Sequence, residues 1–230
     1  MVTTKTYTAP PISKKEILRY AGCINQSKVE LEQIESLLGE CIEEILPRLS
    51  YKVCYEELPI SITDEVCDFG CMQITSKDLA KNLYGCEKVF LFAATIGVEI
   101  DRLIAKYGHL SQVKAVLLQA IGAERIESLC DAFCNELQTQ MDKEGLSLRP
   151  RFSPGYGDLS LDVQKDIFQI LNCSKYIGLT LNESLLMSPS KSVTAFVGVG
   201  QECTTVKRGC VNCDKQNCAY RKDTENEEFR

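Results

Sequence analysis

The spacing of apolar residues predicts two helices in the first quarter of the chain. Over residues 27–46 apolar side chains return every three or four positions, which is the period of an amphipathic helix, and Pro47 ends the pattern. An earlier helix is expected to start at Ser13, because the sequence Ser-Lys-Lys-Glu forms a capping box with Glu16. The residues before it, up to Pro11, are expected to form a flexible or extended arm.

The next part of the chain contains segments that are typical of strands. Residues 51–60 and 72–74 are predicted strands, and the second leads into a short helix capped by Ser76. Residues 88–97 (KVFLFAATIG) form a continuous apolar run, which predicts the most deeply buried strand. A glycine then turns the chain into a helix over about 98–107.

The longest predicted helix covers residues 111–143. A Pro- and Gly-rich stretch follows at 148–160, then a helix up to about Leu171 and a strand at 192–200. Because helices and strands interleave without a strict βαβ rhythm, the expected fold class is α+β. In this fold, helices pack on a mixed or antiparallel sheet, and a cysteine-rich tail ends the chain. The second half of the long helix shows one apolar face, made of Ile126, Leu129, Cys130, Phe133, Cys134 and Leu137.

Composition limits the classes of function. The chain of 230 residues has a formal charge of −6 and a pI of about 5.1, so it lacks the basic character of a nucleic-acid-binding protein. Its apolar runs are too short to span a membrane, and its N-terminus lacks the apolar core of a signal peptide, so a cytoplasmic location is expected. Thiols stay reduced there, and the 13 cysteines therefore indicate metal or redox chemistry rather than disulfides.

Several common functional motifs are absent from the sequence. His109 is the single histidine, which excludes histidine-rich metal sites and leaves no second candidate for a Ser-His-Asp or Cys-His arrangement. No phosphate-binding GxxxxGK[ST] loop is present, and no GxGxxG sequence opens a helix. Cys67 and Cys71 are spaced C-x3-C, but the third cysteine of a radical-enzyme motif does not follow.

The segment RFSPGYG, residues 151–157, has residue types that suit a small zwitterionic ligand. Arg151 is a permanent bidentate donor for a carboxylate, and Tyr156 offers a ring for stacking and a hydroxyl group. Pro154 and Gly155 turn the backbone, which could present its peptide groups to a ligand. On the residues alone, a plain structural turn is the simpler interpretation.

A resemblance favours the ligand interpretation. Arg151, Gly155 and Tyr156 match the R-x-x-x-G-Y signature of the activation (reactivation) domain of cobalamin-dependent methionine synthase, which this segment resembles. The helix before the motif and the run ESLLMSPSKSV after it, which starts at Glu183, are also similar to that family. The resemblance covers about residues 110–198.

The resemblance implies a ligand, a partner and a division of the chain. The family binds S-adenosylmethionine and uses it, with an electron, to restore methylcobalamin from an oxidised corrinoid. Arg151 would then hold the methionine carboxylate, the Gly155–Tyr156 backbone would contact the ligand, and Glu124 or Glu127 would bind the amino group. No catalytic acid or base is expected. The implied parts are an N-terminal α/β portion at 1–90, an S-adenosylmethionine-binding portion at 91–200 and the tail at 201–230.

Two departures from the family shape the expected partner. The tyrosine-bearing strand near the end of the family's domain has no clear equivalent here, since residues 192–200 run directly into cysteines. The corrinoid signature D-x-H-x-x-G is absent as well. The chain is therefore expected to stand alone and to act on a corrinoid carried by a partner methyltransferase or by methionine synthase modules, in support of methionine synthesis.

The tail contains four closely spaced cysteines that suit a metal centre. Disulfides do not fit the expected compartment, whereas four thiolates suit either structural zinc or an iron–sulfur cluster. Reactivation of a corrinoid needs a low-potential electron, which a [4Fe–4S] cluster can supply, so the cluster is favoured over zinc. An electron donor is a further candidate partner. The rival hypotheses are a non-catalytic accessory subunit of a corrinoid methyltransferase with a zinc tail, and an electron-transfer protein with a vestigial ligand site. The candidate metal ligands are Cys203, Cys210, Cys213 and Cys218.

Overall fold

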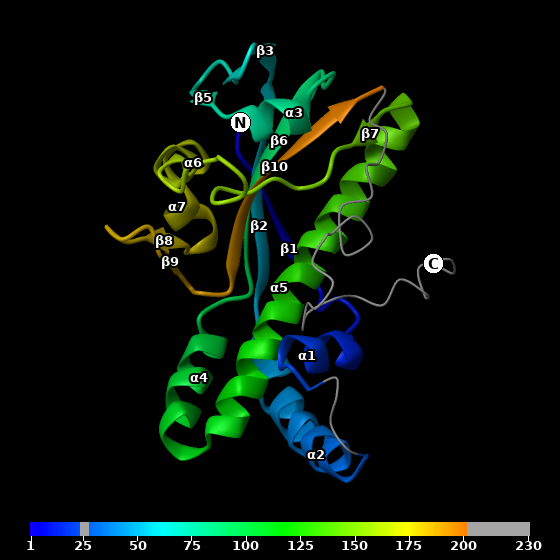
Figure 1. Ribbon diagram of the computed structural model, residues 1–230, viewed down its shortest axis with the longest axis vertical. Coiled ribbons are helices and arrows are strands. Elements are labelled where there is room, and N and C mark those ends of the chain that lie inside the picture. Colours follow the sequence, from blue (N-terminus) through cyan, green and yellow to red (C-terminus); the bar gives the residue numbers. More distant parts are fainter. Residues whose placement is uncertain (24–27, 202–230) are drawn as a thin grey trace.

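A five-stranded antiparallel sheet forms the centre of the protein, in a computed structural model that describes residues 1–23 and 28–201 (Figure 1). The strand order is β1-β2-β6-β10-β7, and every neighbouring pair is antiparallel. A three-stranded sheet and a two-stranded sheet accompany it. The strands are β1 (Thr3–Tyr7), β2 (Tyr51–Pro59), β3 (Ser61–Thr63), β4 (Val66–Asp68), β5 (Gln73–Thr75), β6 (Lys88–Thr95), β7 (Ser147–Leu148), β8 (Thr180–Leu181), β9 (Met187–Ser188) and β10 (Ser192–Gly200).

Helices cover both faces of the central sheet, which confirms the α+β prediction. One face packs against α1, α2, α4 and α5, and the long α5 lies diagonally across it in Figure 1. The other face packs against α3, α6, α7 and the small β3-β4-β5 sheet. The helices are α1 (Lys14–Tyr20), α2 (Lys28–Ile45), α3 (Lys77–Leu83), α4 (Glu99–Leu110), α5 (Gln112–Met141), α6 (Val163–Leu171) and α7 (Cys173–Ile177), with short 3-10 turns at Leu46–Arg48 and Asp142–Glu144.

The position of β6 in the sheet explains why its sequence is apolar at every position rather than at alternate ones. Phe90 and Phe92 face the helices of the α5 side, whereas Val89 and Leu91 face the α3–α6 side. Successive side chains of a strand point to opposite faces, so a strand covered on both faces needs apolar residues at every position. The predicted deep burial of this segment is confirmed, since all of its residues after Lys88 are buried.

Local capping signals placed the helix starts correctly. Ser13 caps α1 by accepting a hydrogen bond from the Glu16 N–H, and Ser76 caps α3 in the same way from Leu79. The predicted helices at 98–107 and 111–143 correspond to α4 and α5, which meet at Ser111. Ser111 ends α4 and also caps α5 through the Lys114 N–H, so one residue marks both boundaries.

The predicted N-terminal arm is an ordered edge strand. Residues 3–7 pair with β2 along their whole length, from Thr3 opposite Tyr55 to Tyr7 opposite Tyr51. Side chains on α5 hold the strand from one face, because Tyr7 donates a hydrogen bond to Glu136 and Lys5 forms an ion pair with the same carboxylate.

A buried charge cluster anchors the segment between β1 and α1 to the middle of α5. Arg125 is fully buried and donates hydrogen bonds to the carbonyl oxygens of Pro10 (2.6 Å) and Pro11 (2.7 Å). Its other donors reach both carboxylate oxygens of Glu124, at 2.5 and 2.7 Å. Glu124 in turn accepts a hydrogen bond from the Ser13 N–H at 3.0 Å. These contacts fix the path of the chain into α1.

The sheet joins the two portions that the sequence divided near residue 90. That boundary falls inside β6, which pairs with β2 on one side and β10 on the other. Residues 1–90 and 91–200 thus contribute to one sheet and to two shared cores. The division into an N-terminal portion and an S-adenosylmethionine-binding portion stays a prediction.

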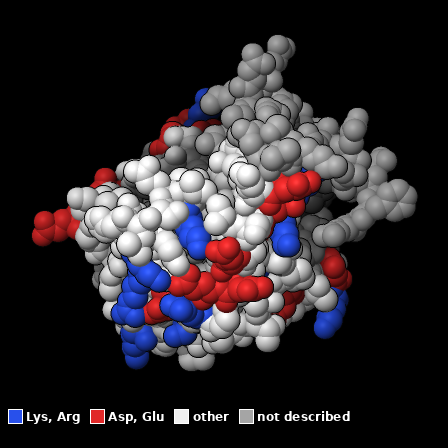
Figure 2. Space-filling view, turned by 90° about the horizontal axis from the view of Figure 1, so that it is seen from below, with Lys and Arg blue, Asp and Glu red and all other residues white. Residues whose placement is uncertain are grey.

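Charged residues of both signs lie together on the surface of the helical end of the molecule. Figure 2 shows Lys and Arg beside Asp and Glu on the lower end of the molecule rather than a continuous basic face. Ion pairs such as Lys106–Glu44 and Lys114–Glu40 join helices there. Within the described part of the chain, no helix is long and apolar enough to cross a membrane.

Candidate functional site

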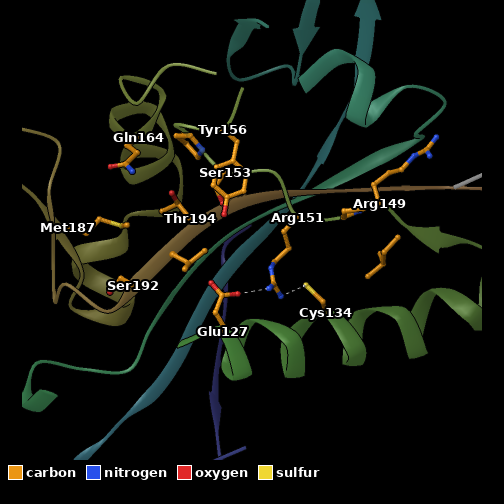
Figure 3. Close-up of a pocket in the computed structure, with 14 residues that line it drawn as sticks. Glu127, Cys134, Arg149, Arg151, Ser153, Tyr156, Gln164, Met187, Ser192 and Thr194 are labelled. Carbon is orange, nitrogen blue, oxygen red and sulfur yellow. Dashed lines mark hydrogen bonds and ion pairs between the residues drawn. The ribbon is translucent and has the colours of Figure 1, made fainter. Parts of the chain in front are cut away.

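A cavity of about 480 Å³ lies beside β10, at the part of its edge that β7 leaves uncovered (Figure 3). Strand β7 pairs only with Val199 and Gly200, and a bridge joins Phe152 to Phe196 farther along. Helix α5 borders the cavity on one face of the sheet, and α6 with the loop after β7 borders it on the other. The lining residues are Glu127, Cys134, Leu148–Arg151, Ser153, Pro154, Tyr156, Gln164, Met187 and Ser192–Thr194.

The open edge of β10 supplies polar groups to the cavity. Phe196 exchanges both peptide hydrogen bonds with Phe152, so its N–H and C=O point away from β6. Alternate residues of an antiparallel strand point their peptide groups to the same side. The peptide groups of Thr194 and Ser192 therefore point the same way as those of Phe196 and face the cavity. Thr194 and Ser192 are buried and line it, which makes this edge a place where a ligand can hydrogen-bond to the sheet.

Arg151 contributes the positive charge of the cavity. Its guanidinium donates to Glu127 at 2.8 Å and to Asp131 at 2.6 Å, both on α5, and lies 3.9 Å from the Cys134 sulfur. Burial works to lower the pKa of this guanidinium, but the neighbouring Cys130, Asp131, Cys134 and Glu127 outweigh it, so the pKa of Arg151 is raised. The charge is therefore permanent at any pH at which the protein folds.

The two thiols beside Arg151 are protonated at neutral pH. Burial raises the pKa of Cys130 well above its usual 9.0. Burial also raises the pKa of Cys134, and the attraction of Arg151 offsets only part of this effect. Since the thiolate is the nucleophilic form, neither cysteine is activated as a nucleophile in this site.

The loop from Ser153 to Asp158 is a compact turn closed by hydrogen bonds within the loop and to Leu159. The Tyr156 N–H donates to the Ser153 carbonyl at 3.0 Å, and the Gly155 N–H donates to the Leu159 carbonyl at 2.8 Å. The Gly155 carbonyl has no hydrogen bond to any described residue. The Tyr156 side chain is 57% exposed at the mouth of the cavity, in edge contact with Phe152.

Asp158 ties this loop to the start of α3. Its carboxylate accepts a hydrogen bond from the Ser76 hydroxyl and from the N–H groups of Lys77 (2.8 Å) and Asp78 (3.2 Å). A carboxylate at a helix N-terminus satisfies N–H groups that lack partners within the helix. The loop that carries Tyr156 is thereby fixed relative to the sheet.

Replacing Gly157 with alanine is expected to destabilise the protein by about 2 kcal/mol or more. Gly157 has a φ of +53°, and an added Cβ would lie 2.1 Å from the Asp78 carboxylate. The control is Gly145→Ala, because Gly145 also has a positive φ (+69°) but open space around it. Urea unfolding should show a clearly larger loss for Gly157→Ala, and equal losses would contradict the close packing of loop and helix.

Acid is expected to release the loop from α3. The Ser76 hydroxyl, followed by the Lys77 and Asp78 N–H groups, lowers the pKa of Asp158 below its usual 3.8. A carboxyl group whose pKa is lower in the folded state stabilises the fold above its unfolded pKa, and this contribution is lost as the pH falls through the folded value. The melting temperature should therefore decrease as the pH is lowered below about 4, and it should decrease less steeply in the Asp158→Asn variant. Parallel curves of melting temperature against pH for the wild type and the variant would contradict the role of Asp158 in holding the loop to α3.

The structure separates the residues predicted for the site. Arg151, Tyr156 and Glu127 line the cavity, and Gly155 shapes its loop with a φ of +91°. Glu124 lies outside the cavity, since the cluster around Arg125 and Ser13 takes up its carboxylate. The four tail cysteines predicted as metal ligands, Cys203, Cys210, Cys213 and Cys218, lie outside the described residues. Within the described residues, no group of three or more Cys, His, Asp or Glu is arranged to hold a metal ion.

Sequence reasoning missed several polar residues of the site, of which three are informative. Asp131 pairs with Arg151, and its signal was its position four residues after Glu127, one helical turn along α5. Thr194 and Gln164 are buried polar residues that line the cavity. Their sequence context is an apolar strand and an amphipathic helix, which gives no sign of a ligand.

An antiparallel sheet covered on both faces, with a charged cavity at its open edge, defines an α+β domain with a candidate ligand site. A family model for the activation domain of vitamin B12-dependent methionine synthase matches residues 76–223, and the chain belongs to this family. The match extends beyond the resemblance at 110–198 on both sides and includes the four tail cysteines. No curated protein sequence is detectably similar to the chain.

Solved structures support the same fold. The chain is similar to the reactivation domain of MetH, determined in a crystal structure bound to AdoHcy, with a TM-score of 0.63 and 12% sequence identity. The alignment covers 86% of this chain and 78% of that one. At this sequence identity the likeness establishes the fold but assigns no role to any residue of the cavity.

Proposed function

We propose that the chain binds S-adenosylmethionine in the cavity at the edge of β10 and serves the reductive methylation of a partner's corrinoid. Family membership supports the reaction, and the pair formed by Arg151 and Glu127 supports the ligand. The corrinoid cobalt, as Co(II), would take up one electron and the methyl group of the sulfonium. Methylcobalamin and S-adenosylhomocysteine would result.

The charges around Arg151 complement the amino acid end of this ligand. A guanidinium and a carboxylate 2.8 Å apart can each exchange their partner for the ligand's carboxylate and ammonium group. Glu127 fits the ammonium role because it lines the cavity, and Asp131 would keep Arg151 in place while Glu127 turns to the ligand. The Gly155 carbonyl and the Tyr156 side chain would contact the rest of the ligand. The contribution to the methyl transfer is position rather than acid–base catalysis.

Binding and reactivation provide the test. Calorimetry should show one S-adenosylmethionine per chain. Purified corrinoid methyltransferases or methionine synthase modules in the Co(II) state should then regain methylcobalamin when the chain, the ligand and a low-potential reductant are supplied together. The control omits the chain. Absence of ligand binding would overturn the proposal, whereas binding without methylation would favour the accessory-subunit alternative.

The tail supports a second part of the proposal, a [4Fe–4S] cluster held by Cys203, Cys210, Cys213 and Cys218. The support is the donor set, four thiolates spaced by six, two and four residues, together with a reaction that consumes an electron. Metal analysis of anaerobically purified protein should find about four irons per chain, with loss of iron in Cys213→Ser. Stoichiometric zinc in place of iron would contradict the cluster and leave an external electron donor to be found.

A further inference from the structure

Gln164 has a buried amide oxygen without a hydrogen-bond partner. The residue lies in the first turn of α6, is only 5% exposed and lines the cavity. Its Oε1 makes no hydrogen bond to any described residue. A buried polar atom without a partner lowers the stability of the fold by about 1–3 kcal/mol. Such atoms are rare in native proteins, and a functional role is one explanation for them. A ligand that donates a hydrogen bond at this position would remove the cost.

The position of Gln164 relative to Arg151 indicates which part of a ligand it meets. In Figure 3, Arg151, Glu127 and Cys134 lie together on the α5 side, whereas Gln164 lies across the cavity on α6. Met187 is drawn on the same side as Gln164. The charged end of the cavity suits an amino acid group, and the Gln164 end is polar but uncharged.

We propose that Gln164 selects the base of the bound nucleoside, as the residue that recognises adenine. A carboxamide offers one acceptor beside one donor group, and the adenine edge offers the complementary pair, the N6 amino group and the N7 acceptor. Oε1 of Gln164 would accept from N6–H while its amide nitrogen donates to N7. The inference rests on the proposed binding of S-adenosylmethionine, and it goes beyond that proposal by assigning the specificity for adenine to one side chain.

The same geometry rejects a 6-oxo purine. Hypoxanthine and guanine present two acceptors, O6 and N7, along this edge, so Oε1 of Gln164 would remain without a donor. A well-placed bidentate amide is worth about 1–3 kcal/mol of discrimination between bases, which is about 5- to 150-fold in affinity. The cavity should therefore prefer an adenosyl over an inosyl ligand by about this factor.

Calorimetric titration with S-adenosylhomocysteine and S-inosylhomocysteine tests the assignment. The wild-type chain should prefer the adenosyl ligand by about 5- to 150-fold, and Gln164→Met, of similar length but without hydrogen-bonding groups, should bind both with nearly equal affinity. Gln169→Met is the matched control, since Gln169 lies on the same helix but is exposed, and it should keep the wild-type preference. Circular dichroism verifies that each variant is folded.

The outcomes separate this inference from the proposed function. A wild-type chain that binds neither ligand overturns both. A chain that binds the adenosyl ligand but shows no preference, or whose Gln164→Met variant keeps the preference, overturns the assignment of Gln164 alone. If Gln164→Met does not fold, Gln164→Glu takes its place. It keeps the acceptor but loses the donor to N7, so adenosyl affinity should fall by at least about 5-fold, and unchanged affinity also overturns the assignment.

Discussion

Replacing Arg151 with alanine should weaken the binding of S-adenosylmethionine by at least about 30-fold. Arg151 supplies the positive charge that the ligand carboxylate needs, and Glu127 and Asp131 would remain to repel that carboxylate. Stability should change little, because the Glu127 and Asp131 side chains are 43% and 64% exposed and water can solvate them once the guanidinium is gone. Calorimetry for affinity and urea unfolding for stability distinguish the two effects.

The neighbouring arginine provides a matched control for this variant. Arg149 also lines the cavity, but its guanidinium donates to the Tyr84 carbonyl at 2.8 Å, away from Glu127. Arg149→Ala removes an equal charge two residues away and should reduce the affinity by only a few-fold, about the effect of a distant screened charge. An Arg151→Ala variant that binds as tightly as the wild type, or no more weakly than Arg149→Ala, would refute the role of Arg151 as the carboxylate clamp.

Local signals predicted much of the fold. The Ser13 and Ser76 caps act within three residues, and the continuous apolar run of β6 reports burial on both faces, so these features are written in short stretches of sequence. The arm before Pro10 is different. Residues 3–7 contain no run of strongly β-forming apolar residues, and they form β1 because the edge of β2, about fifty residues away in the chain, and Glu136 on α5 hold them. Such long-range pairing has no local signature.

The candidate site shows the same limit. Arg151 and Tyr156 could be identified because the signature places them five residues apart in one loop. Glu124 and Glu127 could not be separated by sequence, because they lie three residues apart on one helix and both positions can face the sheet. The choice depends on where α5 meets the Pro10–Pro11 segment, which occupies Glu124 through Arg125 and leaves Glu127 to the cavity. Gln164 gave no signal because only tertiary structure buries its amide.

Replacing Arg125 with methionine should destabilise the protein by about 3–5 kcal/mol. The substitution keeps an unbranched side chain but leaves the Glu124 carboxylate, 3% exposed, without its counter-ion. It also removes the donors that reach the Pro10 and Pro11 carbonyls, so the connection between β1 and α1 loses its anchor on α5. Thermal and urea unfolding should show this loss while calorimetry shows nearly normal ligand affinity in the folded fraction, because neither Glu124 nor Arg125 lines the cavity.

Two further variants identify the cause of the stability loss in Arg125→Met. Arg102→Met breaks the Arg102–Glu99 pair on α4, where the arginine side chain is 68% exposed, and should cost no more than about 0.5 kcal/mol. Glu124→Gln combined with Arg125→Met removes the uncompensated buried charge and should recover part of the stability lost in Arg125→Met alone. If the double variant is no more stable than the single one, the lost carbonyl contacts of Pro10 and Pro11 dominate. If Arg125→Met costs as little as Arg102→Met, the buried cluster does not anchor the N-terminal segment, and the separation of Glu124 from Glu127 loses its physical basis.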